Sequence, residues 1–143
     1  MTPAQENAAK SCLLGAENDT MTFPEIVQTL IQAGFESYAI DYRRCRAIYY
    51  LPDGQSAEYP THQLGSVAER FDTNAIQAAI RDAQQLAPGY TYKGFCQKVI
   101  KAGCAGYVVS FAGRRAVYIG RTAEIHVEHF PSSGTAFLSF AHP

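Results

Sequence analysis

The sequence predicts an α+β fold in which two tandem units, about residues 2–60 and 73–131, each contain two helices and three antiparallel strands. The main observation is an internal similarity. A shift of 69 residues places Gly34 over Gly103 and gives nine identities in the 28 positions from 22 to 49. Both copies also show helical apolar periodicity followed by tyrosine-rich, strand-like segments, so the pattern indicates an internal duplication. The aligned identities are Thr22 with Thr91, Gln28 with Gln97, Ile31 with Ile100, Ala33 with Ala102, Gly34 with Gly103, Tyr38 with Tyr107, Arg46 with Arg115, Ala47 with Ala116 and Tyr49 with Tyr118.

Chain length is the further observation behind this fold class. A chain of 143 residues suits one domain, whereas a unit of about 70 residues forms only a marginal core by itself. We therefore expect the two units to pack as a single α+β domain over residues 1–131. Residues 132–143 are expected to form a C-terminal tail.

Capping signals mark the starts of the four expected helices. Residues 2–5 and 22–25 each place a threonine three positions before glutamine or glutamate, which is the arrangement of a capping box. Gly34 is expected to end the second helix, because the left-handed conformation costs glycine least. In the second unit we expect Thr73 to cap the third helix and Thr91 to cap the fourth.

Segments rich in tyrosine and isoleucine predict the strands. Ser37–Tyr42 and Cys45–Tyr50 lie two residues apart, which predicts a tight hairpin in which the numbers of paired residues sum to 87. This register places Asp41 opposite Arg46, and we expect the two side chains to form a cross-strand ion pair. The remaining expected strands are 56–59, 106–111, 115–119 and 125–130.

Composition and charge exclude several function classes. The chain has 12 Lys and Arg residues against 13 Asp and Glu residues, and this balance does not favour a nucleic-acid or membrane-surface partner. No run approaches the ~18 apolar residues of a membrane-spanning helix, and the polar start lacks the features of a signal peptide. A cytoplasmic location is therefore expected. The four cysteines show no metal-binding spacing and are expected to act as small buried hydrophobic residues.

The near-neutral total hides a charge asymmetry between the two units. Residues 1–71 contain 5 basic and 9 acidic side chains, a net charge of −4, whereas residues 72–143 contain 7 and 4, a net charge of +3. Such a split suits two halves that attract each other, or a basic second half that receives an anionic ligand.

Two equivalent arginines are candidate anion-binding residues. The acidic residue expected opposite Arg46 is replaced by Ser110 opposite Arg115, so Arg115 is expected to lack a cross-strand carboxylate. Its guanidinium would then be free for a phosphate or carboxylate ligand. The alternative interpretation is a pair of solvated hairpin ends.

The segment from His126 to His129 is the second candidate site. In a strand, His126 and Glu128 share a face while His129 points the opposite way, so this segment supplies at most two of the three ligands of a catalytic zinc. We therefore expect no metal and no cofactor. With one inserted residue, Glu58 aligns with Glu128, and paired carboxylates are suited to acid–base chemistry. The alternative is that these are polar side chains on surface strands.

Seven segments along the chain carry a recognisable set of motifs. These are Met21–Val27, Ala33–Glu36, Asp41–Arg44, Tyr49–Gly54, Gly89–Cys96, Ala102–Tyr107 and His126–Pro131. In them the chain resembles the YbcV-like bacterial family of unknown function, whose members are sometimes labelled phage envelope proteins. The resemblance covers about residues 8 to 131 and implies a small bacterial or prophage-associated protein with no established reaction.

The sequence favours a non-enzymatic binding or interaction protein, with an anionic small molecule, another protein or a second copy of itself as the partner. The alternative is a small enzyme or an anionic small-molecule binder whose site lies at the junction of the two units and uses Arg115, Glu128 and His126. A phage-derived assembly protein is the third hypothesis. A groove with converging polar groups would favour a ligand site, whereas an exposed apolar patch would favour an interaction protein.

Overall fold

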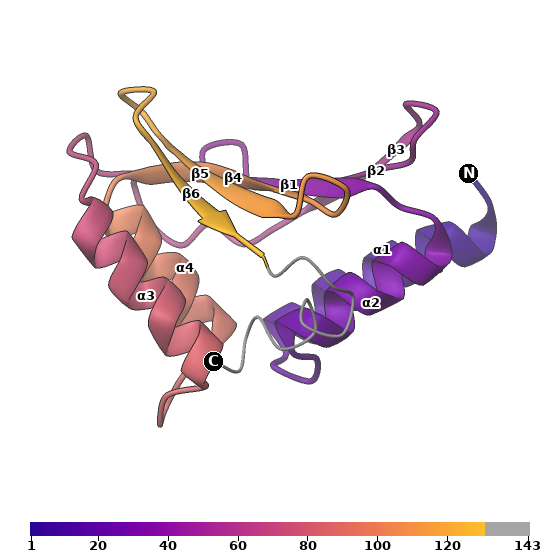
Figure 1. Ribbon diagram of the computed structural model, residues 1–143, viewed down its shortest axis with the longest axis horizontal. Coiled ribbons are helices and arrows are strands. Elements are labelled where there is room, and N and C mark those ends of the chain that lie inside the picture. Colours follow the sequence, from indigo (N-terminus) through magenta and orange to yellow (C-terminus); the bar gives the residue numbers. More distant parts are fainter. Residues whose placement is uncertain (131–143) are drawn as a thin grey trace.

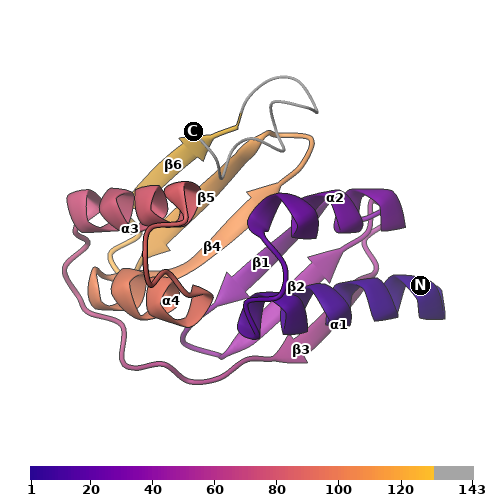
Figure 2. The same cartoon turned by 90° about the horizontal axis from the view of Figure 1, so that it is seen from below.

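The computed structural model describes residues 1–130, which form four helices and one six-stranded antiparallel sheet. The predicted α+β class is confirmed, and the predicted tail over residues 132–143 lies outside the described residues. All four helices lie on one side of the sheet, α1 and α2 beneath one half and α3 and α4 beneath the other (Figures 1 and 2). The helices are α1 (Pro3–Glu17), α2 (Phe23–Ala33), α3 (Thr73–Gln85) and α4 (Tyr92–Lys101). The strands are β1 (Ser37–Asp41), β2 (Arg46–Tyr50), β3 (Ser56–Pro60), β4 (Cys104–Ser110), β5 (Arg115–Gly120) and β6 (Ile125–His129).

The strand order β3-β2-β1-β4-β5-β6 gives each predicted unit one half of the sheet. The two halves meet where β1 pairs antiparallel with β4, and Ala39 lies opposite Val108 at the centre of this seam. Two backbone bonds extend the seam beyond the strands, from the Tyr42 N–H to the Ala105 carbonyl and from the Phe111 N–H to the Glu36 carbonyl. The sheet is therefore continuous, and neither unit has a sheet of its own.

Gly106 allows the two halves to approach closely at this seam. A Cβ atom at this position would lie 2.5 Å from the carbonyl oxygen of Ile40, a distance that real Cβ atoms do not adopt. Glycine is the residue that permits such a close backbone approach. The contact between the two halves therefore depends on a residue without a side chain.

The hairpin register predicted for β1 and β2 is confirmed, with Tyr38 opposite Tyr49 and Asp41 opposite Arg46. The predicted ion pair between Asp41 and Arg46 is wrong. The Asp41 carboxylate instead accepts hydrogen bonds from two backbone N–H groups of the turn, 2.9 and 3.0 Å away. An aspartate at a turn entrance satisfies otherwise unpaired backbone donors in this way. Arg46 instead lies with its Nε 3.6 Å from Oε2 of Glu58.

The predicted starts of the first two helices and the predicted end of the second helix are confirmed. Thr2 and Gln5 form a complete capping box at α1, and Thr22 and Glu25 form the equivalent box at α2. Gly34 ends α2 in the left-handed conformation, with φ of 99°.

The third helix begins one residue earlier than predicted. Asp72, and not Thr73, is its N-cap, and the Asp72 carboxylate accepts a hydrogen bond from the Ala75 N–H at 3.1 Å. A carboxylate both caps the helix and interacts favourably with its dipole, which explains the preference. Thr91 caps α4 as predicted.

Three of the four cysteines lie in the core between the helices and the sheet. Cys12, Cys96 and Cys104 are buried free thiols, and burial raises the pKa of each to about 11. They are therefore protonated at neutral pH, and the expectation of small buried hydrophobic residues is confirmed for these three, whereas Cys45 is only half-buried. Among residues 1–130, no helix combines the length and the apolar character needed to cross a membrane.

Candidate functional site

A row of six aromatic rings, one from each strand, crosses the helix-facing side of the sheet. Successive ring centroids along this aromatic row are 5.2 to 6.3 Å apart. Two of the contacts are the predicted cross-strand pairs Tyr38–Tyr49 and Tyr107–Tyr118, and the β1–β4 seam joins them into one row. The members in spatial order are Tyr59, Tyr49, Tyr38, Tyr107, Tyr118 and His126.

A cavity of about 480 Å³ lies between the central part of this row and the two helix pairs. It is lined by the C-terminal half of α1, the α1–α2 loop, the start of α2, the end of α3, the α3–α4 loop and the start of α4. The volume falls within the range of small-molecule sites, roughly 300–1,000 Å³. The cavity thus lies at the junction of the two predicted units, and both contribute to its walls.

The walls of the cavity are mainly apolar. Asp19 is the one charged side chain among the described lining residues, and its carboxylate accepts a hydrogen bond from the Tyr92 N–H at 2.9 Å. This bond joins the α1–α2 loop to the N-terminus of α4, where a negative charge is stabilised. The described lining contains no lysine, arginine or histidine. A buried anionic ligand would therefore find no positive partner in these walls.

Tyrosine hydroxyl groups supply most of the polarity in the cavity. The hydroxyl oxygens of Tyr92 and Tyr107 lie 2.9 Å apart and share a hydrogen bond in which either group could be the donor. The hydroxyls of Tyr49 and Tyr118 make no hydrogen bond with another described residue. These two residues are only 3% and 6% exposed and belong to the cavity lining.

Burial fixes the protonation state of these tyrosines. It raises the pKa of Tyr49 and of Tyr118 well above the ordinary tyrosine value of 10.0. Both hydroxyls are therefore neutral and able to donate one hydrogen bond and accept others at physiological pH. Because Tyr49 and Tyr118 are also equivalent under the 69-residue shift, the cavity presents one such hydroxyl from each half of the sheet.

The predicted arginine sites lie outside this cavity. Arg46 and Glu58 lie on the helix-free face of the sheet, where they form their half-exposed ion pair. Arg115 is exposed at the other end of the same face, and its Nε donates a hydrogen bond to the Gly113 carbonyl at 3.0 Å. The structure therefore brings Arg46 and Glu58 together and leaves Arg115 separate from both.

His126 and Glu128 lie together on the helix-facing side of β6. The distance from His126 Nε2 to Glu128 Oε2 is 2.8 Å, and both side chains are largely buried. The predicted equivalence of Glu58 and Glu128 is wrong, because Glu58 pairs with Ile48 whereas Glu128 pairs with Ala116. An offset of one residue moves a side chain to the opposite face of a sheet, so the two carboxylates point to opposite sides.

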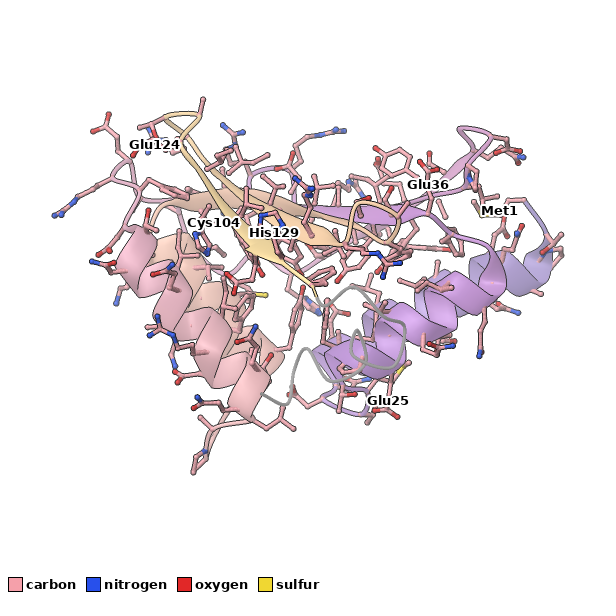
Figure 3. The ribbon with its side chains drawn as sticks, viewed as in Figure 1. Met1, Glu25, Glu36, Cys104, Glu124 and His129 are labelled. Carbon is pink, nitrogen blue, oxygen red and sulfur yellow. The ribbon has the colours of Figure 1, made fainter. Side chains whose placement is uncertain are left out.

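The described residues contain no cluster of three or more His, Cys, Asp or Glu side chains suited to a metal ion. His126 and Glu128 are thus a pair without a third ligand from residues 1–130. Neither side chain belongs to the cavity lining. In Figure 3 the labelled residues Glu36 and Glu124 lie near the ends of the sheet. Glu25 lies in the first turn of α2, at the end of the α1–α2 pair that is away from Met1.

Sequence reasoning did not find Asp19 and Tyr92 as site residues. They are 73 residues apart in the chain, and no local pattern indicates that they form a hydrogen bond. The recurrence of Tyr49 and Tyr118 is visible in the sequence, but it does not indicate that their hydroxyls line a cavity.

No protein-family model matches this sequence, and no curated protein matches it. The resemblance to the YbcV-like family therefore stays a prediction from the quoted motifs.

Proposed function

We propose that the protein binds a small, uncharged and mainly apolar molecule in the cavity between the two helix pairs and the sheet. The observation that carries this proposal is the cavity itself, about 480 Å³ in volume and mainly apolar, with Tyr49 and Tyr118 in its lining. Their hydroxyls make no hydrogen bond with another described residue, so both are available to a polar group of a ligand.

The size of the cavity argues against a simple packing defect. Protein interiors contain few voids larger than a water molecule. The volume of about 480 Å³ is many times that of a single water molecule, and apolar side chains form most of the walls. A bound apolar molecule would remove this apolar surface from water. The described walls argue against an anionic ligand because they contain no basic side chain, and burying an unpaired charge is strongly unfavourable.

The two open hydroxyls define what polar groups the ligand would carry. Tyr49 and Tyr118 lie on β2 and β5, on either side of the central strand pair. A flat or elongated molecule with a hydroxyl, carbonyl or amine group near one or both ends would satisfy them. The aromatic faces of the same tyrosines would pack against its apolar body.

Binding without catalysis is the function class that these features support best. The His126–Glu128 pair is the chemical group most suited to proton transfer, but it does not belong to the described cavity lining. The enzyme hypothesis therefore has less support. The anionic-ligand alternative also has less support, because Arg46 and Arg115 lie outside the cavity.

We further infer that the two halves arose by duplication of one helix–helix–three-strand unit. The aligned identities, the symmetric strand order and the equivalent positions of Tyr49 and Tyr118 support this origin. We also propose membership of the YbcV-like bacterial family, on the motifs quoted above, and with it a bacterial or prophage-associated source. These proposals fit a binding protein whose site formed between the duplicated units.

Two fluorescent probes that differ by one sulfonate group test the proposed site. N-phenyl-1-naphthylamine is neutral, and 1-anilinonaphthalene-8-sulfonate is the same ring system with an added sulfonate. We expect the neutral probe to bind at least about tenfold more tightly, because the cavity offers the sulfonate no cation. Tighter binding of the sulfonate would instead support the anionic-ligand alternative.

A cavity-filling variant localises the probe. Ala83 lines the cavity from α3, so Ala83→Phe should weaken binding of the neutral probe about tenfold or more. Leu14→Phe, at a residue that is 47% exposed on α1, is the matched control and should leave binding unchanged. Equal probe affinity in wild type and Ala83→Phe would contradict the proposal.

A further inference from the structure

The helix-free face of the sheet carries a second row of side chains, in which apolar residues extend from β2 to β6. The cross-strand partners at its centre run continuously through both halves. Figure 1 shows that no helix formed by residues 1–130 covers this face. The members of this aliphatic row, in spatial order, are Ile48, Ala39, Val108, Val117 and Val127.

Several large apolar side chains on this face are exposed to solvent. Val108 is 38% exposed, and Ile119 and Ile125 beside the row are 36% and 57% exposed. Four of the seven large apolar residues with high exposure among residues 1–130 therefore lie on this one surface, namely Tyr50, Val108, Ile119 and Ile125. Contiguous apolar patches of this kind mark interaction sites more often than single exposed residues do.

Charged residues lie at the edges of this face. Asp41 and Arg46 lie at one end of the strands, Arg115 and His129 lie at the other end, and Glu58 lies on the edge strand β3. An apolar centre surrounded by a polar rim is the usual anatomy of a protein–protein interface.

We propose that this face packs against the same face of a second copy, in a dimer whose two-fold axis runs parallel to the strands. The strand order makes the face self-complementary under this rotation, because β1 then covers β4 and β2 covers β5 of the other copy. Ile48 lies over Val117 of the second copy, and Tyr50 lies over Arg115, where a cation–π contact is available.

Charge selects this rotation over the other face-to-face arrangement. With the axis parallel to the strands, β3 of one copy covers β6 of the other. Glu58 then approaches the strand that carries His129. With the axis perpendicular to the strands, Glu58 would face Glu58 of the second copy, which is unfavourable.

The area is compatible with a dimer of modest affinity. Six strands at about 4.8 Å spacing and about 17 Å length give a flat footprint of roughly 400 Å² per copy. The corrugated accessible surface is larger, so the pair approaches the ~1,200 Å² lower bound of stable interfaces. Two packed sheets with aligned strands are also a common arrangement in proteins.

Sedimentation equilibrium on the full chain tests the dimer. We expect a monomer–dimer equilibrium for the wild type and an increase of at least about tenfold in the dimer dissociation constant for Val117→Glu. Leu14→Glu, which places the same charge on an exposed position of α1, should leave the constant unchanged. Circular dichroism verifies that both variants are folded. A wild type that stays monomeric at all accessible concentrations overturns the proposal.

Cross-linking tests the arrangement. In a Cys45→Ser background, a chain with Glu58→Cys mixed with a chain with Val127→Cys should couple through a short bismaleimide, whereas Val127→Cys alone should not. Efficient coupling of Val127→Cys with itself would indicate the perpendicular axis and overturn the arrangement proposed. These readouts are independent of probe binding in the cavity, so the two proposals can fail separately.

Discussion

The two faces of the sheet carry parallel rows of opposite chemistry. The aromatic row faces the helices, and its four central tyrosines line the cavity and are almost fully buried. The aliphatic row on the other face consists of small and β-branched residues and is partly exposed. Both rows cross the β1–β4 seam, so one sheet builds two different candidate surfaces. The two faces therefore differ in what they can pack against. The tyrosine rings border the cavity beneath the helix pairs, whereas the short, branched side chains of the other face form a flat surface suited to another sheet.

Alkaline pH should affect the aromatic side most. Burial raises the pKa of Cys12, Cys96 and Cys104 to about 11 from the ordinary cysteine value of 9.0. In the unfolded chain these thiols ionise at lower pH than in the folded protein. Stability should therefore be constant below pH 9 and fall progressively as the pH rises to 11, by on the order of 5 kcal/mol.

Urea unfolding between pH 7 and 11 measures this loss, with the free energy of unfolding extrapolated to water. The buried tyrosines, whose pKa values are also raised, extend the decline above pH 10. A free energy of unfolding that stays constant to pH 11 would contradict the burial described for these groups. The Cys104→Ala variant should show a shallower pH dependence.

Truncation should separate the two rows clearly. Tyr107→Ala removes a buried ring from the aromatic row and should lower the free energy of unfolding by about 3–5 kcal/mol. Val108→Ala, the adjacent residue on the other face, should lower it by less than about 1 kcal/mol. Denaturant midpoints of monomeric protein provide the measurement. Similar losses for the two variants would show that the faces do not differ as described.

The β1–β4 seam can be weakened at Gly106, a residue that belongs to neither row. Gly106→Ala places a Cβ atom 2.5 Å from the Ile40 carbonyl oxygen and should destabilise the fold by about 2–3 kcal/mol. Ala39→Val, across the same seam but pointing away from the helices, is the control and should change stability by less than about 0.5 kcal/mol. A neutral Gly106→Ala variant would mean that β1 and β4 can separate at no cost.

The smallest expected effect sharpens the role of the open hydroxyls. Tyr118→Phe should leave the free energy of unfolding within about 1 kcal/mol of wild type, because this hydroxyl makes no hydrogen bond with another described residue. 2-Naphthol carries a hydroxyl that naphthalene lacks, so the wild type should bind 2-naphthol more tightly than naphthalene. Tyr118→Phe should reduce this ratio of affinities by about fivefold. Competition with the neutral probe measures both compounds. Tyr50→Phe, on the helix-free face, should leave the preference unchanged.

Local signals gave most of the secondary structure. The capping boxes at Thr2 and Thr22 were readable because a cap depends on residues three positions apart. The β1–β2 register followed from the separation of two short segments. Errors occurred where two local solutions compete, as at Asp72 and Thr73, or where one residue of offset reverses a face, as for Glu58 and Glu128.

The sequence by itself therefore determined the helices, the strands and the four aromatic positions that repeat with the 69-residue shift. These depend on short-range periodicity, capping and turn chemistry, which operate within one segment of chain. Only the tertiary structure decided that β1 pairs with β4, that Asp19 meets the start of α4, and that a cavity remains between the helix pairs. Those features arise from how separately formed segments pack, and packing depends on the shapes of residues far apart in the sequence.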